Sequence, residues 1–416
     1  MKYVVIGASA AGMNGAENLR RMDPNGEITV VSTDEYIYSR CIIHHYISGE
    51  RTKEGINFVD KDFFEKTNIN WIKGRSAVKL LEDEKKVVLD DGQEVDYDKL
   101  LIASGSRPFI PPIENLREGI NVVGMKTLDD CDRVIELAKK AQSIAVVGAG
   151  LIGMDAVTGL LHSKSVSAKL SLVETNDRLL PLQLDKKASI QYENELIKGG
   201  VDLYLESFVQ VANLNEQKEV VSLGLRDGRV VTADLVIVAT GVRSNIEFLE
   251  GTNVELSKCG LVFNARGETN VKDVYGAGDV SGIAPIWPVA VKEGIIATNN
   301  MTGEVCEMTD FFTSKATMNF FDIPTLSLGD SIKPEQEYVE QGYSVEVDEG
   351  SKGTYKKIIH KDGVIFGAIV QGDLSYAGIL TQLIRSKMDI SKVKKSLFKI
   401  DYSDFFKLKN NHEFTF

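Results

Sequence analysis

The sequence predicts an α/β protein built from two nucleotide-binding units and a separate C-terminal α+β region. Two observations support this prediction. A strand, a glycine-rich turn and a helix follow one another at the N-terminus, and the same order recurs from residue 143 onward. A helix that begins after such a turn offers free N–H groups and a positive dipole end to a pyrophosphate. We therefore expect two Rossmann-like dinucleotide-binding domains.

The first unit opens with the apolar run Tyr3 to Ile6, which is typical of a buried strand. The residues expected to form its phosphate cradle are Gly7, Ser9, Ala10, Ala11 and Gly12. Gly7 permits the tight turn and Gly12 lets the helix pack closely on the strand, whereas Ser9 replaces the usual middle glycine. An acid after the second strand, Ile28 to Val31, should bind ribose hydroxyls; Asp34 and Glu35 are both within reach, and we favour Asp34.

Composition excludes several classes of protein. The chain has 416 residues, 43% of them hydrophobic, which is enough for two or three cores. No apolar run approaches the roughly 20 residues of a membrane span, and no leader pattern precedes the first strand, so we expect a cytoplasmic protein. The four cysteines are far apart, which indicates neither a disulfide scaffold nor a metal site. A net charge of −12 argues against nucleic acid as the main partner.

The segment Tyr36 to Gly49 combines a cation, a thiol, two imidazoles and three phenols, a density that is unusual for packing alone. Strands are expected at 69–78, 85–89, 95–97 and 100–103, with Asp91-Gly92 as a hairpin turn. The prolines Pro111 and Pro112 indicate a crossover to a new domain.

The second unit begins with the strand Ser143 to Val147. It carries the complete fingerprint, whose binding residues are Gly148, Gly150, Leu151, Ile152 and Gly153. The next strand ends on Glu174, which is placed to bind a ribose diol and would repel a 2′-phosphate. The nearest cation is Arg178, beside a Leu-Leu-Pro run, so we expect NADH in preference to NADPH.

Each unit ends in a similar turn. The strand Leu235 to Ala239 leads to Gly241, echoing Ala103, Ser104 and Gly105 of the first unit. A third turn, Gly276 to Asp279, follows, and an Asp after a Gly-x-Gly turn can bind a polyol such as the ribityl chain of a flavin through Gly278 and Asp279. The helix expected at 288–300 would direct its N-terminus at the flavin.

The region from about Cys306 has no phosphate-binding signature. Strand-like runs, one helix at 376–388 and a lysine-rich aromatic tail predict an α+β interface domain. The tail lysines could dock an acidic redox partner, or they could form a solvated face; they are Lys392, Lys394, Lys395, Lys399, Lys407 and Lys409.

In this order, the motifs resemble the two-dinucleotide flavoprotein disulfide reductase superfamily over essentially the whole chain. The resemblance implies a discontinuous FAD domain at 1–112 and 241–305, an inserted NADH domain at 113–240, and an interface or dimerisation domain at 306–416. It also implies a homodimer or a subunit of a redox complex, and it leaves the electron acceptor open.

Two subfamilies match the segment around Cys41. Glutathione-type reductases carry a cysteine pair here and are excluded. Cys41, Tyr46 and Gly49 resemble the NADH oxidase, NADH peroxidase and coenzyme A disulfide reductase group. Tyr38-Ser39-Arg40 and Trp287 instead resemble NADH:rubredoxin oxidoreductase, nitrite reductase flavin domains and ferredoxin reductases, with Arg40 and Trp287 at the cofactor.

The resemblance also implies catalytic residues. Ferredoxin reductases have a Lys–Glu pair beside the flavin where this chain has His45 and Asp155, so these two are expected to tune hydride transfer, or His45 to be structural. Cys41, next to Arg40, is expected either to have a depressed pKa and act as a redox thiol, or to fill space.

The predicted function is NADH-dependent transfer of hydride to FAD and of electrons onward. The leading acceptor is a small carrier protein of the rubredoxin or ferredoxin type. A Cys41-dependent reductase of a low-molecular-weight disulfide, persulfide or peroxide is the alternative enzyme. A flavin-bearing binding or assembly protein, as in the apoptosis-inducing flavoproteins, is the third reading.

Overall fold

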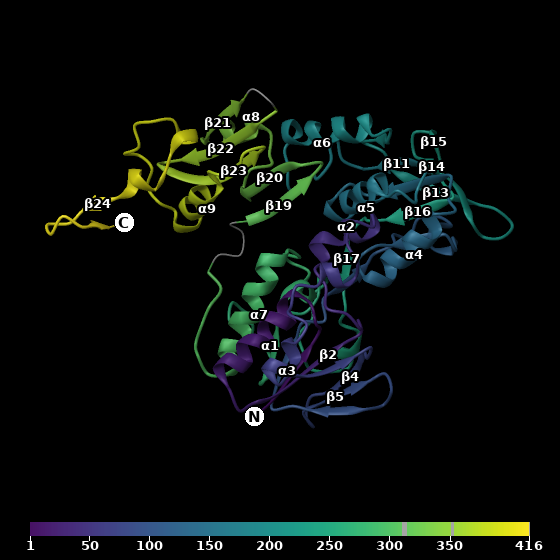
Figure 1. Ribbon diagram of the computed structural model, residues 1–416, viewed down its shortest axis with the longest axis horizontal. Coiled ribbons are helices and arrows are strands. Elements are labelled where there is room, and N and C mark those ends of the chain that lie inside the picture. The colour runs from purple at the N-terminus through teal and green to yellow at the C-terminus, as the bar shows by residue number, and fades with distance from the viewer. Residues whose placement is uncertain (310–313, 351–352, 416) are drawn as a thin grey trace.

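A computed structural model describes residues 1–309, 314–350 and 353–415 of the chain. It contains three sheets of five strands and several smaller ones, arranged as three bodies (Figure 1). The N-terminal sheet lies below, the second parallel sheet lies to the right, and the C-terminal antiparallel sheet lies at the upper left.

The first sheet is parallel, with the order β18-β7-β1-β2-β3. Its strands are β1 (Lys2–Ile6), β2 (Glu27–Ser32), β3 (Asn70–Lys73), β7 (Lys99–Ile102) and β18 (Val274–Gly276). The helices α1 (Ala10–Met22) and α7 (Trp287–Met301) pack against each other beside this sheet. Because β18 and α7 follow the second unit in sequence, the chain leaves this body and returns to it.

The second sheet repeats the parallel arrangement, with the order β12-β11-β10-β16-β9. Its strands are β9 (Val122–Gly124), β10 (Ser143–Val147), β11 (Lys169–Val173), β12 (Asp202–Tyr204) and β16 (Leu235–Val238). The helices α4 (Leu128–Ala138), α5 (Leu151–His162) and α6 (Lys186–Lys198) belong to this body. The predicted α/β class with two Rossmann-like units is confirmed.

Antiparallel strands extend both units. In the first unit, β4 (Ala77–Leu81), β5 (Lys86–Leu89) and β6 (Glu94–Asp96) form a three-stranded antiparallel sheet. The predicted hairpin turn lies between β5 and β6, at Gly92, whose φ is 84°. The counterpart of this sheet in the second unit is β13-β14-β15 (Val209–Leu214, Val220–Leu225, Val230–Thr232). The two crossover segments pair with each other as β8 (Ser106–Pro108) and β17 (Val242–Ser244). The similar turns that end the two units therefore lead into strands that contact each other.

The C-terminal body is an antiparallel sheet with the order β19-β20-β23-β22-β21. Its strands are β19 (Ser314–Phe320), β20 (Ile323–Gly329), β21 (Ser344–Glu349), β22 (Tyr355–Lys361) and β23 (Val364–Gln371), accompanied by α8 (Glu335–Glu340) and α9 (Ala377–Ser386). A small hairpin, β24 (Lys407–Leu408) and β25 (Phe414–Thr415), extends away from it (Figure 1). The α+β prediction is confirmed.

The C-terminal body is joined to the second unit by buried polar contacts. Lys357 Nζ lies 3.0 Å from Asp185 Oδ2, the carboxylate that caps α6, and the hydroxyl of Tyr355 donates to the same oxygen. Tyr192 of α6 donates to Thr325 of β20. The two bodies share one hydrophobic core, whereas the exact domain boundaries stay predictions.

The segment 40–47 forms a 3-10 turn, Arg40–Ile42, and the short helix α2 (Ile43–Ile47). A second short helix, α3 (Phe63–Thr67), follows. Helix α2 packs directly on α5. The contact is so close that a Cβ added at Gly159 of α5 would stand 2.9 Å from the carbonyl oxygen of His44. This contact brings the unusual segment to the second nucleotide-binding unit. Across the described ranges, no helix is long and apolar enough to cross a membrane.

Candidate functional site

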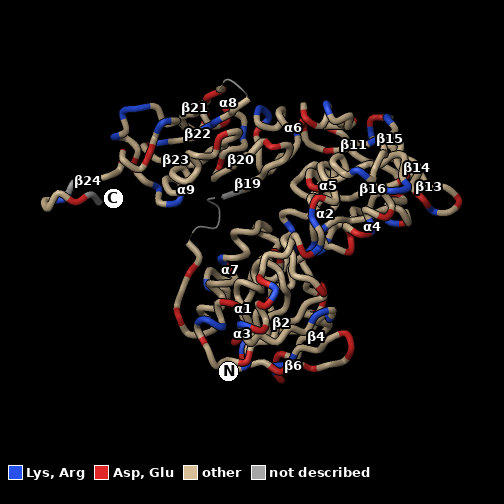
Figure 2. The backbone as a smooth tube through the Cα atoms, in the orientation of Figure 1, with Lys and Arg blue, Asp and Glu red and all other residues tan. Residues whose placement is uncertain are grey.

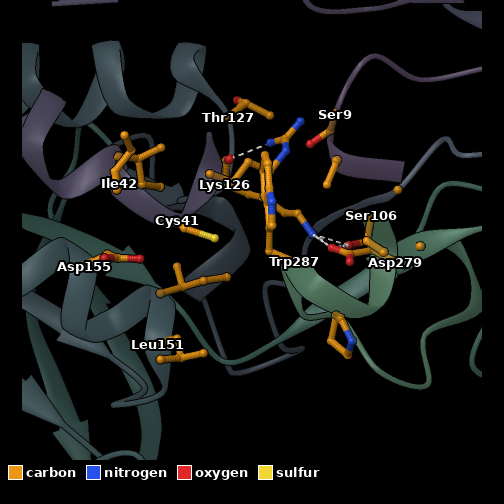
Figure 3. Close-up of a pocket in the computed structure, with 18 of the residues that line it drawn as sticks. Ser9, Cys41, Ile42, Ser106, Lys126, Thr127, Leu151, Asp155, Asp279 and Trp287 are labelled. Carbon is orange, nitrogen blue, oxygen red and sulfur yellow. Dashed lines mark hydrogen bonds and ion pairs between the residues drawn. The ribbon is translucent and has the colours of Figure 1, made fainter. Parts of the chain in front are cut away.

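A cavity of about 1590 Å³ is lined by residues from all three bodies. Figure 3 shows a close-up of part of its lining. Most of the sequence-predicted site residues line it, and they come from both glycine turns and from the segment around Cys41. They are Gly7, Ser9, Ala10, Ala11, Asp34, Arg40, Cys41, His45, Ala103, Ser104, Gly105, Leu151, Ile152, Asp155, Gly278, Asp279 and Trp287. Gly12, Gly148, Gly150, Gly153, Glu174 and Gly241 do not line it; the glycines among them shape the turns.

The first glycine turn has the geometry of a phosphate cradle. Gly7 has a φ of 112°, and a Cβ at Gly12 would stand 1.8 Å from the carbonyl oxygen of Gly7, so both positions require glycine. Ser9 is the N-cap residue of α1, and its side chain accepts no capping hydrogen bond. The first N–H groups of α1 therefore face the cavity and can bind an anion.

The second turn reproduces this geometry. Gly148 has a φ of 101°, and a Cβ at Gly153 would stand 1.9 Å from the carbonyl oxygen of Gly148. Gly150 caps α5 with open space around its Cα. Gly241 has a φ of 126° and starts the turn that leads into β17. The N-terminus of α5 is thus a second helix end that can bind an anion, and its first residues, Leu151 and Ile152, line the cavity.

Glu174 lies beneath the second turn, at the end of β11. Its Oε2 accepts the N–H of Ala149 at 2.7 Å, and its Oε1 accepts the N–H of Asn176 at 2.8 Å. The side chain of Arg178 is held by the carbonyl oxygen of Leu184 at 3.0 Å and by Asp177. The predicted ribose-binding carboxylate is therefore fixed at the turn, and the nearby cation is already engaged.

Asp34 and Arg40 face each other across the first cradle. Arg40 Nη2 lies 3.1 Å from Asp34 Oδ2, and its Nη1 donates to the carbonyl oxygen of Lys126 at 2.6 Å. Burial raises the pKa of Asp34, while Arg40 and the hydroxyl of Tyr38 act in the opposite direction. The ribose-binding role of Asp34 stays a prediction.

Lys126 is a site residue that sequence reasoning missed. Its Nζ lies 2.7 Å from Asp279 Oδ2 and also contacts the hydroxyl of Ser106. Burial lowers the pKa of this lysine, and Asp279 opposes that effect. Lys126 does not belong to a glycine motif; it directly precedes Thr127, the N-cap residue of α4. Its contact with Asp279 forms only in the folded protein, so no signal in the sequence indicated it.

The structure pairs Asp155 with His44 and not with His45, whereas the roles expected for His45 and Asp155 in hydride transfer stay predictions. His44 Nδ1 lies 2.6 Å from Asp155 Oδ1, although its N–H makes no aligned hydrogen bond. His45 Nδ1 lies 2.5 Å from Glu50 Oε2 instead. Successive residues of a helix point about 100° apart, so only one histidine of α2 can face α5. Both histidines nevertheless line the cavity.

Cys41 is open to the cavity but largely surrounded by protein, and its redox role stays a prediction. Burial, followed by the charges of Asp155 and Asp279, raises the pKa of the thiol to about 11. The Arg40 side chain turns to Asp34 and Lys126 and therefore does not stabilise a thiolate. Tyr46, the other residue of the oxidase-like pattern, donates to Asp132 and does not line the cavity.

Helix α7 closes the cavity beside Asp279. Trp287, in the first turn, lines the cavity and packs edge-on against Phe58 with ring centroids 4.9 Å apart. Glu293, six residues further along α7, accepts the N–H of Gly278 at 2.7 Å, and burial raises the pKa of this carboxyl to about 7. Sequence reasoning did not single out Glu293.

These residues fit a bound flavin dinucleotide. Two cations, a carboxylate after a Gly-x-Gly turn and the N-terminal ends of α1 and α7 converge on one cavity. No group of acidic, histidine and cysteine side chains suited to a metal ion occurs in the described part of the chain.

Comparison with known families decides the assignment. Residues 1–294 match the pyridine nucleotide-disulphide oxidoreductase family. The chain belongs to this family. Residues 315–388 match the rubredoxin NAD+ reductase C-terminal domain. The predicted superfamily and the prediction of an NAD(P)H-dependent oxidoreductase are confirmed, and membership implies FAD and a pyridine nucleotide as cofactors.

Several named relatives share 25–29% identity with the chain. The chain is 29% identical to the NADH-dependent phenylglyoxylate dehydrogenase subunit epsilon of Aromatoleum evansii, covering 94% of this chain and 93% of that protein. It is 26% identical to the NADH-rubredoxin oxidoreductase of Clostridium acetobutylicum, covering 94% and 96%. It is 25% identical to the assimilatory nitrate reductase electron transfer subunit of Bacillus subtilis, covering 97% of this chain. The chain spans only 51% of that last relative.

Among solved structures, the NAD-dependent persulfide reductase from A. fulgidus superposes with a TM-score of 0.81 at 27% identity. The match covers 94% of this chain and 77% of the reductase. Relatives of one fold thus include proteins named for a carrier protein and for a sulfur substrate.

Proposed function

We propose that this chain is an NADH-dependent FAD oxidoreductase that passes electrons to a small carrier protein. The observation that carries the proposal is the shared cavity. Ser9, Ala10 and Ala11 of the first cradle and Leu151 and Ile152 of the second line the same space. A nicotinamide held by the second cradle can therefore reach a flavin held by the first.

The first cradle, Arg40, Lys126 and Asp279 would hold FAD, with the N-terminus of α7 near its ring system. When bound, the flavin supplies an acceptor for the nicotinamide hydride. Trp287, His44 and Asp155 line this space, and Asp155 lies on α5 together with Leu151 and Ile152 of the second cradle. We assign to the Asp155–His44 pair the effect on hydride transfer that the sequence suggested for Asp155 and His45.

NADH is favoured over NADPH by the second turn. Glu174 presents a carboxylate where a 2′-phosphate would have to lie, and Arg178 is held by Leu184 and Asp177. The 2′-phosphate of NADPH would therefore be repelled by the Glu174 carboxylate, and the Arg178 guanidinium would not be free to bind it.

A carrier protein of the rubredoxin or ferredoxin type is supported by the C-terminal domain match and by the relatives named for rubredoxin and for an enzyme subunit. The tail lysines support it less. Lys395 is paired with Asp401 and Asp404, the side chain of Lys407 lies outside the described residues, and positive and negative segments alternate in this domain (Figure 2).

A Cys41-dependent reductase is the second candidate, because the thiol is open to the cavity and a persulfide reductase shares the fold. The raised pKa of Cys41 weighs against it in the flavin-free state. Bound cofactor charges would have to lower this pKa for the thiol to act.

Anaerobic titration of the FAD-loaded protein with NADH tests both functions. A carrier reductase should take up two electrons per FAD and then reduce rubredoxin rapidly. Uptake of four electrons, with a thiolate-to-flavin charge-transfer band that Cys41→Ser abolishes, would favour the thiol enzyme. A protein that turns over slowly with every acceptor would instead be a flavin-bearing binding or assembly protein.

A further inference from the structure

Four ionisable side chains lead from the surface into the cavity. Glu50 Oε2 lies 2.5 Å from His45 Nδ1, the rings of His45 and His44 have centroids 4.1 Å apart, and His44 Nδ1 lies 2.6 Å from Asp155 Oδ1. The exposed fraction of the side chains falls along this series, from 64% at Glu50 to 29%, 14% and 11% at Asp155. The series therefore leads from solvent to a buried carboxylate, with the two imidazole rings lying side by side in its middle.

The inner end of the series lies beside the reaction space. Asp155 projects from α5 into the cavity near Cys41 (Figure 3), and its charge contributes to the raised pKa of that thiol. Burial raises the pKa of Asp155 itself, and contact with His44 opposes this. A carboxylate in this position is costly unless a proton or a cation accompanies it. Asp155 and His44 are thus suited to share a proton.

Two unpartnered atoms indicate that water completes the series. The hydroxyl of Thr158, one turn along α5 from Asp155, is buried without a hydrogen-bond partner, and His44 Nδ1 has no aligned one. Both residues line the cavity. Buried polar atoms without a protein partner are usually met by ordered water. Water at this point would connect His44, Thr158 and Asp155.

The reaction requires such a connection, given the proposed function on which this inference rests. With a one-electron carrier, NADH and two oxidised carriers yield NAD+, two reduced carriers and one proton. With a disulfide, NADH, one proton and the disulfide yield NAD+ and two thiols. In either case one proton per NADH must move between the cavity and solvent.

We propose that Glu50, His45, His44 and Asp155 form the path for this proton. In the outward direction Asp155 takes the proton and passes it to Nδ1 of His44. His44 then releases its Nε2 proton, through one water, to Nε2 of His45. His45 releases its Nδ1 proton to Glu50, which exchanges with solvent. Each ring gains a proton on one nitrogen and loses one from the other, so it ends neutral.

Proton release can be measured with an acceptor that takes electrons alone. The FAD-loaded protein is reduced with NADH and mixed with ferricyanide in a weakly buffered solution that contains a pH-indicator dye. In the unsubstituted protein the dye signal should follow flavin re-oxidation without delay. In His45→Ala and Glu50→Gln the dye signal should lag at least tenfold, and imidazole should restore it in His45→Ala.

His360→Gln is the matched control, because His360 also pairs with a carboxylate, Glu346 at 3.2 Å, but lies in the C-terminal sheet. In His360→Gln the dye signal and flavin re-oxidation should have the same time course. If His45→Ala does not bind FAD, the exposed Glu50 still provides the test through Glu50→Gln. Coincident traces in both His45→Ala and Glu50→Gln would overturn the path. Ferricyanide needs no docking surface, so an error in the proposed carrier would not affect this result.

Nitrogen NMR of the flavin-free protein gives a second readout. Outward transfer requires neutral His44 to carry its proton on Nε2, which leaves Nδ1 free to accept from Asp155, and neutral His45 to carry its proton on Nδ1, which faces Glu50. Asp155→Asn or Glu50→Gln should change this preference at the adjacent ring. A proton on Nδ1 of His44 or on Nε2 of His45 in the unsubstituted protein would contradict the proposed direction of transfer.

Discussion

Lys126 Nζ lies 2.7 Å from Asp279 Oδ2, an ion pair that joins the edge of the second nucleotide-binding unit to the end of the first. Lys126 follows β9 of the second sheet and Asp279 follows β18 of the first, so the pair bridges the two sheets at the cavity. It holds a cation and an anion where the two cofactors are expected to meet.

Replacing this lysine should weaken both stability and FAD binding. Lys126→Met leaves the Asp279 carboxylate without its cation, which should cost about 1–3 kcal/mol of unfolding free energy and raise the Kd for FAD at least tenfold. Calorimetry and flavin fluorescence measure the two effects. The control is Lys169→Met, whose exposed pair with Asp202 has the same 2.7 Å separation. Equal behaviour of the two variants would remove Lys126 from the site.

Glu174 should determine affinity for the pyridine nucleotide. Glu174→Gln retains the shape but weakens acceptance of the Ala149 N–H and of the ribose hydroxyls, so KM for NADH should rise about tenfold with a smaller effect on kcat. Asp177→Asn, three residues along and paired with Arg178, serves as the control. A kcat effect larger than the KM effect would contradict a binding role.

Glu293 should make stability depend on pH. Its pKa is raised by burial from 4.5 to about 7, so the folded protein binds the proton more tightly than the unfolded chain. The stabilisation is complete below about pH 4.5 and is lost as pH rises toward 7, with an amplitude of about 1–3 kcal/mol. Glu293→Gln should abolish this fall in the flavin-free protein. Denaturant unfolding across this pH range checks it, and parallel curves for the two proteins would refute it.

Cys41 should react slowly with alkylating agents before FAD binds. With a pKa of about 11, its thiolate fraction near pH 8 is roughly one part in a thousand. Cys41 and Cys259 are both exposed, yet iodoacetamide should label Cys259 before Cys41, as peptide mass spectrometry can follow. Asp155→Asn should speed labelling of Cys41, because the Asp155 charge helps to raise the pKa of this thiol. Faster labelling of Cys41 than of Cys259 would contradict the raised pKa of Cys41 and would support its role as a redox thiol.

The buried pair between Lys357 and Asp185 should hold the C-terminal body on the second unit. The Lys357 side chain is 1% exposed, so Lys357→Met leaves an unpaired buried carboxylate and should cost about 3–5 kcal/mol. Lys187→Met removes an exposed ion pair with Glu349 from the same junction and should cost less than about 1 kcal/mol. Thermal unfolding compares them; similar losses would show that burial at Lys357 carries no special weight.

The sequence was most informative where backbone geometry restricts residue type. Gly7, Gly12, Gly148 and Gly153 are required by positive φ or by contact with a carbonyl oxygen, so the local pattern alone predicted both cradles. Strand and helix periodicity predicted the α/β units and the α+β end. Order along the chain then predicted the superfamily.

Tertiary structure decided what depends on distant partners. Lys126 meets Asp279 across 153 positions, and Asp155 meets His44 rather than His45 because α2 turns only one of them toward α5. The pKa of Cys41 follows from burial and from carboxylates brought by other elements, not from its neighbour Arg40. Short-range patterns determine backbone geometry, whereas the direction and the electrostatic surroundings of a side chain are set only when separate elements pack.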